Sequence, residues 1–340
     1  MDTKIISFKE ALSQCTGKKH IFLGNGFSIA CRSEIFLYKN LYESADFSNN
    51  EHIKSLFSKL GTYDFEEVIQ VLDKSSFILP LYNTDPNLRN SLKDDSSLLK
   101  EILLKTICGK HPDLPSEIRD SEYLNCGLFL QNFDCIYTLN YDLLLYWTIM
   151  NLMNREDIKI KCNDGFSTSQ EKDGFVVWSS ENHNTNVYFL HGALHIFDDG
   201  DKMVKFTWCK TGIRLIEQIR YALKTNRFPV FVSEGTSKEK MTRINHNAYL
   251  SKAYRSFASI AGNLFIYGHS LAENDKHIMN LIAAGKIKNL YVSIFGDENS
   301  KNNIKIIENA NSLVNERLNY NPKIPLNITF FRSESAKVWR

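Results

Sequence analysis

The stretch Tyr137-Thr138-Leu139-Asn140-Tyr141-Asp142 joins an apolar run that ends at Ile136 to a second apolar run that starts at Leu143. A short β-branched and aromatic run, then polar residues, then helical spacing predicts a buried strand, a turn and a helix. The polar residues then lie at the carboxyl end of a strand, where open α/β sheets bind their ligands. Asn140 and Asp142 are therefore either ligand-binding residues or caps of the following helix, where both residue types are preferred.

The bulk properties are those of an ordinary globular protein. The chain has 340 residues, of which 43% are hydrophobic, so it can bury a large core. Its 41 basic and 39 acidic residues give a formal charge of +2, which predicts neither a nucleic-acid nor a membrane partner. The N-terminus carries too many charges for a signal peptide, and no apolar run approaches the length of a membrane span, so we expect a cytoplasmic protein.

The seven cysteines are irregularly spaced, and no two of them form a Cys-x-x-Cys pair. This pattern argues against a zinc ribbon and against a disulfide framework. Buried core positions are the default interpretation for such cysteines, and no metal site is expected.

A second polar turn follows the predicted strand His20 to Leu23 and reads Gly24-Asn25-Gly26-Phe27-Ser28. The two glycines allow a sharp turn with close backbone approach, and Ser28 is expected to cap a helix whose amides point at a pyrophosphate. The third glycine of the dinucleotide fingerprint is replaced by Ile29. The turn is therefore either a nucleotide loop or a tight structural turn.

Helical spacing dominates from about residue 35 to residue 130, with Asp64 as a candidate cap and the polar tract 83–97 as an expected surface loop. Strands are predicted afterwards at 175–178, 186–190, 229–232, 264–267, 291–295 and 326–331. This alternation predicts an α/β fold with a Rossmann-like, largely parallel doubly wound sheet. We expect a single domain over residues 1–340 with a helical insertion at about 35–130.

Two further strand ends carry candidate site residues. The strand 186–190 ends in His191-Gly192, and the strand 264–267 ends in Gly268-His269-Ser270-Leu271. The carboxyl ends of parallel strands meet along one edge of a sheet, so these residues are expected to converge with Asn140. His191 is then a crevice residue rather than a buried structural histidine, whereas His195 is expected to be structural.

In chain order, the motifs Gly24 to Ser28, Thr138 to Asp142, Leu190-His191-Gly192 and Gly268 to Leu271 resemble those of the sirtuin-like family. Two departures disfavour a deacetylase. The interval between the last two motifs contains only Cys209 where deacetylases carry a four-cysteine zinc module, and Tyr141 and Asn25 replace the usual Ile and Ala. The chain is more similar to bacterial sirtuin-like effectors of antiphage defence, and that resemblance implies hydrolysis of NAD⁺ to ADP-ribose and nicotinamide.

The resemblance also implies roles for individual residues. Asn140 would position the water or the ribose, and His191 would be the general base, with a pKa near its ordinary value of about 6.5. Asp142 would orient the ribose or stabilise developing positive charge. NAD⁺ is the substrate, so no separate cofactor is expected. The residues implied to bind the nucleotide are Gly24, Asn25, Gly26, Phe27, Ser28, Thr138, Tyr141, Gly268, His269, Ser270 and Glu273.

A constitutively active NAD⁺ hydrolase would poison its host, so regulation is expected through a homo-oligomer or through a partner sensor or ATPase protein of a defence system. The main alternative is a module that binds NAD or ADP-ribose without turnover. Preference for NAD⁺ or NADP⁺ is not determined by these residues.

Overall fold

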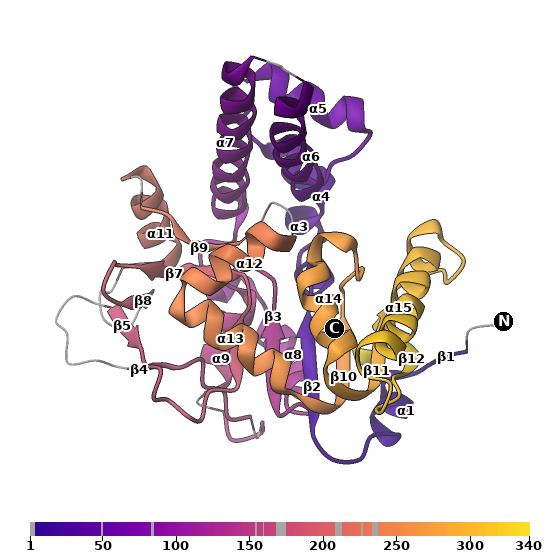
Figure 1. The fold of residues 1–340 in the computed structure, drawn as a ribbon. Helices are drawn as coiled ribbons and strands as arrows, with labels where there is room; N and C mark the ends of the chain where they lie inside the picture. Colours follow the sequence, from indigo (N-terminus) through magenta and orange to yellow (C-terminus); the bar gives the residue numbers. More distant parts are fainter. Residues whose placement is uncertain are drawn as a thin grey trace.

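The computed structural model describes residues 4–48, 50–82, 85–153, 155–158, 160–167, 175–207, 213–225, 227–232 and 237–340, with backbone only for 237–239 (Figure 1). A parallel sheet with helices on both faces forms the centre of the fold. Its seven strands run in the order β1-β12-β11-β10-β2-β3-β6. Their bounds are Ile5–Ile6 (β1), Lys19–Leu23 (β2), Cys135–Thr138 (β3), Val187–Phe189 (β6), Ala261–Tyr267 (β10), Lys286–Ile294 (β11) and Asn327–Arg332 (β12).

Every strand pair in this sheet is parallel, which confirms the predicted Rossmann-like class. From β2 the chain moves outward through β3 to β6, and it then returns to the other side of β2 at β10. The strand order therefore reverses between β2 and β10. In open α/β sheets the crevice at such a reversal is the usual ligand site.

The two faces of the sheet carry separate hydrophobic clusters because side chains alternate along each strand. On β2, Ile21 and Leu23 pack on one face with residues of α8 and α9, while Phe22 packs on the other with residues of α13, α14 and α15. The sheet is therefore doubly wound. The helices of this core are Phe8–Ser13 (α1), Gly26–Cys31 (α2), Asp120–Leu130 (α8), Leu144–Leu152 (α9), Ser237–His246 (α12), Ala248–Ser259 (α13), Lys276–Ala284 (α14) and Lys301–Tyr320 (α15).

A second, antiparallel sheet has the order β4-β5-β8-β7-β9. Its strands are Phe166–Ser167 (β4), Phe175–Trp178 (β5), Gly192–Asp198 (β7), Met203–Phe206 (β8) and Pro229–Phe231 (β9), and the helix Leu215–Lys224 (α11) lies beside it. The strands predicted at 175–178 and 229–232 thus exist but belong to this sheet. The length and composition of a segment can predict that it forms a strand, whereas its partner strand and their relative direction depend on tertiary packing.

The predicted helical insertion is confirmed between β2 and β3, and Figure 1 shows α6 and α7 side by side, projecting beyond the sheet. The helices are Ser33–Phe36 (α3), Tyr38–Ser44 (α4), Glu51–Leu60 (α5), Phe65–Ile78 (α6) and Pro86–Lys110 (α7), with 3₁₀ turns at Leu79–Tyr82 (η1) and Pro115–Glu117 (η2). Asp64 caps α6 by accepting the amide hydrogen of Glu66, as expected.

The prediction of a surface loop at 83–97 is wrong for residues 86–97, because α7 begins at Pro86. Residues 83 and 84 lie outside the described ranges. Proline is favoured at the first helical position, and Asp85 caps the helix by accepting the amide hydrogen of Asn87. The polar composition reflects an exposed first half of a long helix. Across the described ranges, no helix combines the length and apolarity that a bilayer crossing requires.

Candidate functional site

Two glycine-containing loops meet where the strand order reverses. A Cβ on Gly26 would lie 2.5 Å from the Cα of Gly268, and a Cβ on Gly24 would lie 2.6 Å from the carbonyl oxygen of Gly268. Gly268 itself has φ +69°, a conformation that favours glycine. The glycines of both motifs are therefore required by contact between the loop after β2 and the loop after β10.

Three amides of the first loop are already bonded within the protein. Gly24 donates to the carbonyl of Tyr267 at 3.0 Å, Gly26 donates to Gly268 at 2.8 Å, and Phe27 donates to Gly24 at 2.9 Å. A pyrophosphate would have to replace these bonds in order to bind the same amides. In this conformation the loop is therefore a tight structural turn, which is one of the two alternatives that the sequence left open.

Ser28, Asn140 and Asp142 form one buried hydrogen-bonded group. Asn140 Nδ2 donates to Ser28 Oγ at 2.8 Å, and Ser28 Oγ donates to Asp142 Oδ2 at 2.5 Å. Asp142 Oδ1 accepts the amide hydrogen of Leu144 at 2.8 Å, so Asp142 also supports the start of α9. The backbone amide of Asn140 is held by the side-chain oxygen of Thr138 at 3.0 Å.

The expectation that Ser28 caps a helix is wrong. Ser28 lies inside α2, whose N-cap position is Asn25. The helix starts three residues earlier than expected, and the amide of its first residue, Gly26, donates to the carbonyl of Gly268. This places the Ser28 hydroxyl between Asn140 and Asp142, which are more than 100 positions away in the chain.

His191 lies at the junction of the two sheets. Gly192, the first residue of β7, has φ +82°, and a Cβ there would lie 1.9 Å from the carbonyl oxygen of Val230. The carbonyl of His191 accepts the amide hydrogen of Val232 at 2.9 Å. The His-Gly pair thus connects β6 to the antiparallel sheet and fixes His191 at the carboxyl edge of the parallel one.

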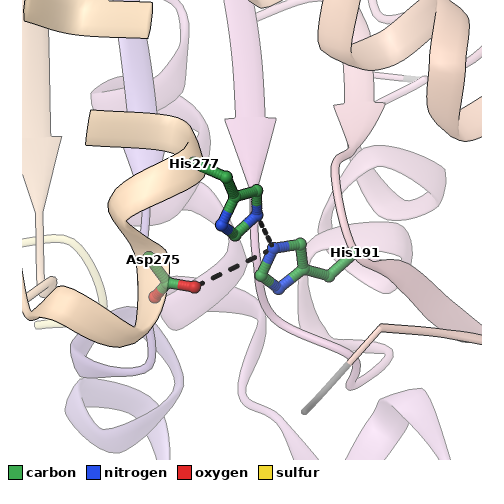
Figure 2. Close-up of side chains that lie close together, drawn as sticks. All are labelled: His191, Asp275 and His277. Carbon is green, nitrogen blue, oxygen red and sulfur yellow. Dashed lines mark hydrogen bonds and ion pairs between the residues drawn. The ribbon is translucent and has the colours of Figure 1, made fainter. Parts of the chain in front are cut away.

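A buried cluster of ionisable side chains surrounds His191 (Figure 2). His191 Nε2 lies 2.9 Å from Nε2 of His277 and 3.9 Å from Oδ1 of Asp275. The other carboxylate oxygen of Asp275 lies 2.9 Å from His269 Nε2. His269 Nδ1 accepts the amide hydrogen of Leu271, so its proton is on Nε2 and is donated to Asp275.

Lys240 on α12 completes the cluster. Its side chain is 1% exposed, and its Nζ lies 3.0 Å from Asp275 Oδ1 and 3.7 Å from Glu66 Oε2 on α6. A buried ammonium group requires such carboxylate partners. Lys240 therefore joins the helical insertion to the edge of the parallel sheet.

Burial sets the protonation states of the cluster. Desolvation, together with the charge of Lys240, lowers the pKa of His191 well below its ordinary value, and desolvation lowers the pKa of His277 to about 4. Desolvation alone would raise the pKa of Asp275, but Lys240 and His269 outweigh it and hold this pKa well below the usual range. His191 is therefore neutral and a weaker base than the expected value near 6.5 implies.

Tyr141 links the two groups. Its hydroxyl donates to the carbonyl of Val232 at 2.9 Å, and its ring lies nearly parallel to that of His191, with centroids 6.5 Å apart. Asn140 precedes Tyr141 directly, so the Ser28 group and the His191 cluster occupy adjacent positions on one edge of the sheet.

The remaining predicted site residues lie farther from these groups or serve the fold. Asn25 donates to the carbonyl of Phe36, and Phe27 packs against Trp339. Ser270 and Glu273 are exposed. His195 is buried beside aromatic rings, in agreement with the structural role expected for it.

Four residues of the cluster are not among the site residues that the sequence predicted: Asp275, His277, Lys240 and Glu66. Asp275 and His277 follow the Gly268 motif within ten residues, and their Asp-x-His spacing was the available signal. Lys240 and Glu66 have no local signal, because only the packing of α12 and α6 against the sheet brings them to Asp275.

The site is closed in this conformation. Asn140 is 8% exposed and His191 is 1% exposed. Two surface cavities, of about 460 and 400 Å³, lie elsewhere and include none of these residues in their linings. A dinucleotide needs a pocket on the scale that ligand sites commonly have, about 300–1,000 Å³. The buried cluster must therefore open before a dinucleotide can bind there.

The fold and the site together define a Rossmann-like α/β protein with a buried histidine, aspartate and lysine cluster at the carboxyl edge of its parallel sheet. Residues 21–339 match the family described as "Domain of unknown function (DUF4917)", and the chain belongs to that family. No curated protein matches the chain.

Proposed function

We propose that this protein is a NAD⁺ glycohydrolase of sirtuin-like type, which cleaves NAD⁺ to ADP-ribose and nicotinamide. One observation carries the proposal: the four motifs that resemble the sirtuin-like family follow four neighbouring parallel strands, β10, β2, β3 and β6, at their carboxyl ends. Ligands of open α/β sheets bind at that edge, beside the reversal of strand order.

The reaction demands little acid catalysis. The nicotinamide of NAD⁺ is already a cationic pyridinium and departs as a neutral molecule. The remaining requirement is a water molecule placed to trap an oxocarbenium-like transition state, with a base to take its proton. Asn140 would orient the water or the ribose hydroxyl, and His191 would accept the proton.

Asp142 acts through Ser28 in this scheme. Both of its carboxylate oxygens are engaged, one by Ser28 and one by the amide of Leu144. Asp142 therefore orients the hydroxyl that holds Asn140 rather than contacting the ribose. It is a positioning residue.

The closed site supports regulation. Opening requires Lys240 to leave the carboxylates of Asp275 and Glu66, which would separate α12 and the helical insertion from the edge of the sheet. We propose that a phage-triggered signal, delivered through self-association or a partner sensor or ATPase protein, produces this opening. The protein would then deplete cytoplasmic NAD⁺ in infected cells.

The test measures nicotinamide release from NAD⁺ by mass spectrometry, with purified protein and with extracts of infected cells that express it. Asn140→Ala is expected to lower the rate by about 100-fold or more, since positioning and proton transfer contribute at this scale. Asn327→Ala, at an exposed asparagine on β12, is the control and should leave the rate unchanged.

A folded wild-type protein that releases no nicotinamide in either setting contradicts the proposal. If such a protein nevertheless binds NAD⁺ or ADP-ribose in calorimetry, the result favours a nucleotide-binding sensor. Two observations favour this second function. His191 is buried, and its pKa lies well below the ordinary value for histidine, so it is a weak base.

A further inference from the structure

Three buried side chains from different elements direct donor atoms at one point. His191 follows β6, Asp275 ends the 3₁₀ turn Glu273–Asp275 (η3), and His277 is on α14. One donor atom from each lies within 4.8 Å of the other two. Figure 2 shows the two imidazole rings and the carboxylate facing one another.

The spacing of these atoms matches the spacing of ligands around a small metal ion. Tetrahedral zinc holds imidazole nitrogen and carboxylate oxygen at roughly 2.0–2.2 Å, which places neighbouring ligand atoms about 3.3 Å apart. The observed separations are 2.9 Å between the two Nε2 atoms and 3.9 Å from His191 Nε2 to Asp275 Oδ1. Small side-chain movements would equalise them.

We propose that His191, Asp275 and His277 form a binding site for a divalent transition-metal ion of the zinc type, with one coordination position open. Imidazole and carboxylate donors suit such ions, whereas magnesium prefers an all-oxygen environment. The proposal goes beyond the sequence, which predicted no metal, and it does not depend on NAD⁺ hydrolysis. While a metal is bound, the His191 nitrogen that holds it does not accept a proton, so the base role proposed above belongs to the metal-free protein.

Two hydrogen bonds orient the Asp275 carboxylate for metal binding. His269 donates its Nε2 proton to Oδ2, and this bond fixes the carboxylate so that Oδ1 faces His191. Such outer hydrogen bonds commonly orient metal ligands and raise their affinity. The His269 tautomer is itself held by the amide of Leu271.

Lys240 competes with the metal, because its Nζ lies 3.0 Å from the same Oδ1 atom. The ammonium group has a second carboxylate at 3.7 Å, on Glu66, and can remain paired there when Asp275 binds a metal. Removing the ammonium should therefore tighten metal binding. This expectation distinguishes a metal site from a purely structural ion-pair cluster.

The experiment uses the full chain after removal of metals with a chelator. Zn²⁺ is titrated by calorimetry, and bound zinc is counted by elemental analysis after gel filtration. We expect one zinc per chain in the wild type, at least tenfold weaker binding for His277→Gln, and tighter binding for Lys240→Met. The matched control is His20→Gln, at a buried histidine near the start of β2, which should bind zinc as the wild type does.

Co²⁺ binding can be measured on the wild type alone, so this part of the test does not require any variant to fold. Visible d–d absorption of a low-coordinate complex with nitrogen ligands, abolished by stoichiometric Zn²⁺, supports the site. Absence of retained zinc in the wild type, or equal zinc affinity in wild type and folded His277→Gln, overturns the proposal. None of these readouts involves NAD⁺, so their failure leaves the proposed hydrolase activity to its own test.

Discussion

Gly192 and Val230 lie so close that a Cβ on the glycine would sit 1.9 Å from the valine carbonyl oxygen. The backbone at Gly192 also has φ +82°, which L side chains rarely adopt. The glycine that follows His191 is thus required by the junction of the two sheets, whatever chemistry the histidine performs.

Gly192→Ala should lower the free energy of unfolding by about 3 kcal/mol or more, because steric overlap with backbone adds to the strain of positive φ. Gly200→Ala is the matched control, since Gly200 has φ +83° with no atom near its Cβ position, and it should cost only about 1 kcal/mol. Urea denaturation measures both. Equal losses for the two variants would contradict the predicted clash.

Ser28→Ala should destabilise the protein by roughly 1–3 kcal/mol. The substitution leaves Asp142 Oδ2 and Asn140 Nδ2 without their buried partner, and unsatisfied buried polar groups cost about this much. Ser76→Ala is the control, because within the described part of the chain Ser76 Oγ bonds only to the carbonyl of Asp73 in its own helix. A loss for Ser28→Ala no larger than for Ser76→Ala would show that the buried group contributes little.

Arg317→Met should lower the free energy of unfolding by about 3 kcal/mol or more. The buried guanidinium donates to the carbonyls of Ile282, Ala283, Ile287 and Ile324, and methionine fills similar space without any donor. Two of these carbonyls lie in the last turn of α14, where a cation is favoured. Arg317→Lys should lose less, because it keeps the charge; a thermal unfolding series that ranks lysine below methionine would refute this account.

Stability should decrease below neutral pH, in part through His111. Burial lowers the pKa of His111 to about 4, and the neutral ring accepts the amide hydrogen of Leu143 through Nε2. The unfolded chain binds a proton near pH 6.5, so between pH 6.5 and 4 it holds more protons than the folded state, and the free energy of unfolding falls as pH falls. From pH 7 to pH 5 this histidine should account for about 2 kcal/mol.

The measurement compares urea denaturation of wild type and His111→Gln at both pH values. The variant is expected to be less stable at pH 7 but to lose less on acidification. A variant with the same pH dependence as the wild type would show that His111 is not responsible.

The sequence by itself determined the class of fold. Apolar runs that stop at polar turns predicted β2, β3, β6, β10, β11 and β12, and helical spacing predicted the insertion, since both signals are local. It also identified Asn140, His191 and Gly268 as residues at strand ends. The prediction from the sequence was wrong at the start of α7, where the polar tract forms a capped helix with proline at its first position.

Only the tertiary structure decided what those residues contact. Ser28 meets Asn140 and Asp142 because β2 and β3 are neighbours, and Lys240 meets Asp275 and Glu66 because α12 and α6 pack over the same edge. The second sheet was likewise beyond the sequence, because strand propensity does not specify a partner. Local patterns record backbone preferences within a few residues, whereas burial, pairing and pKa depend on groups brought together from distant parts of the chain.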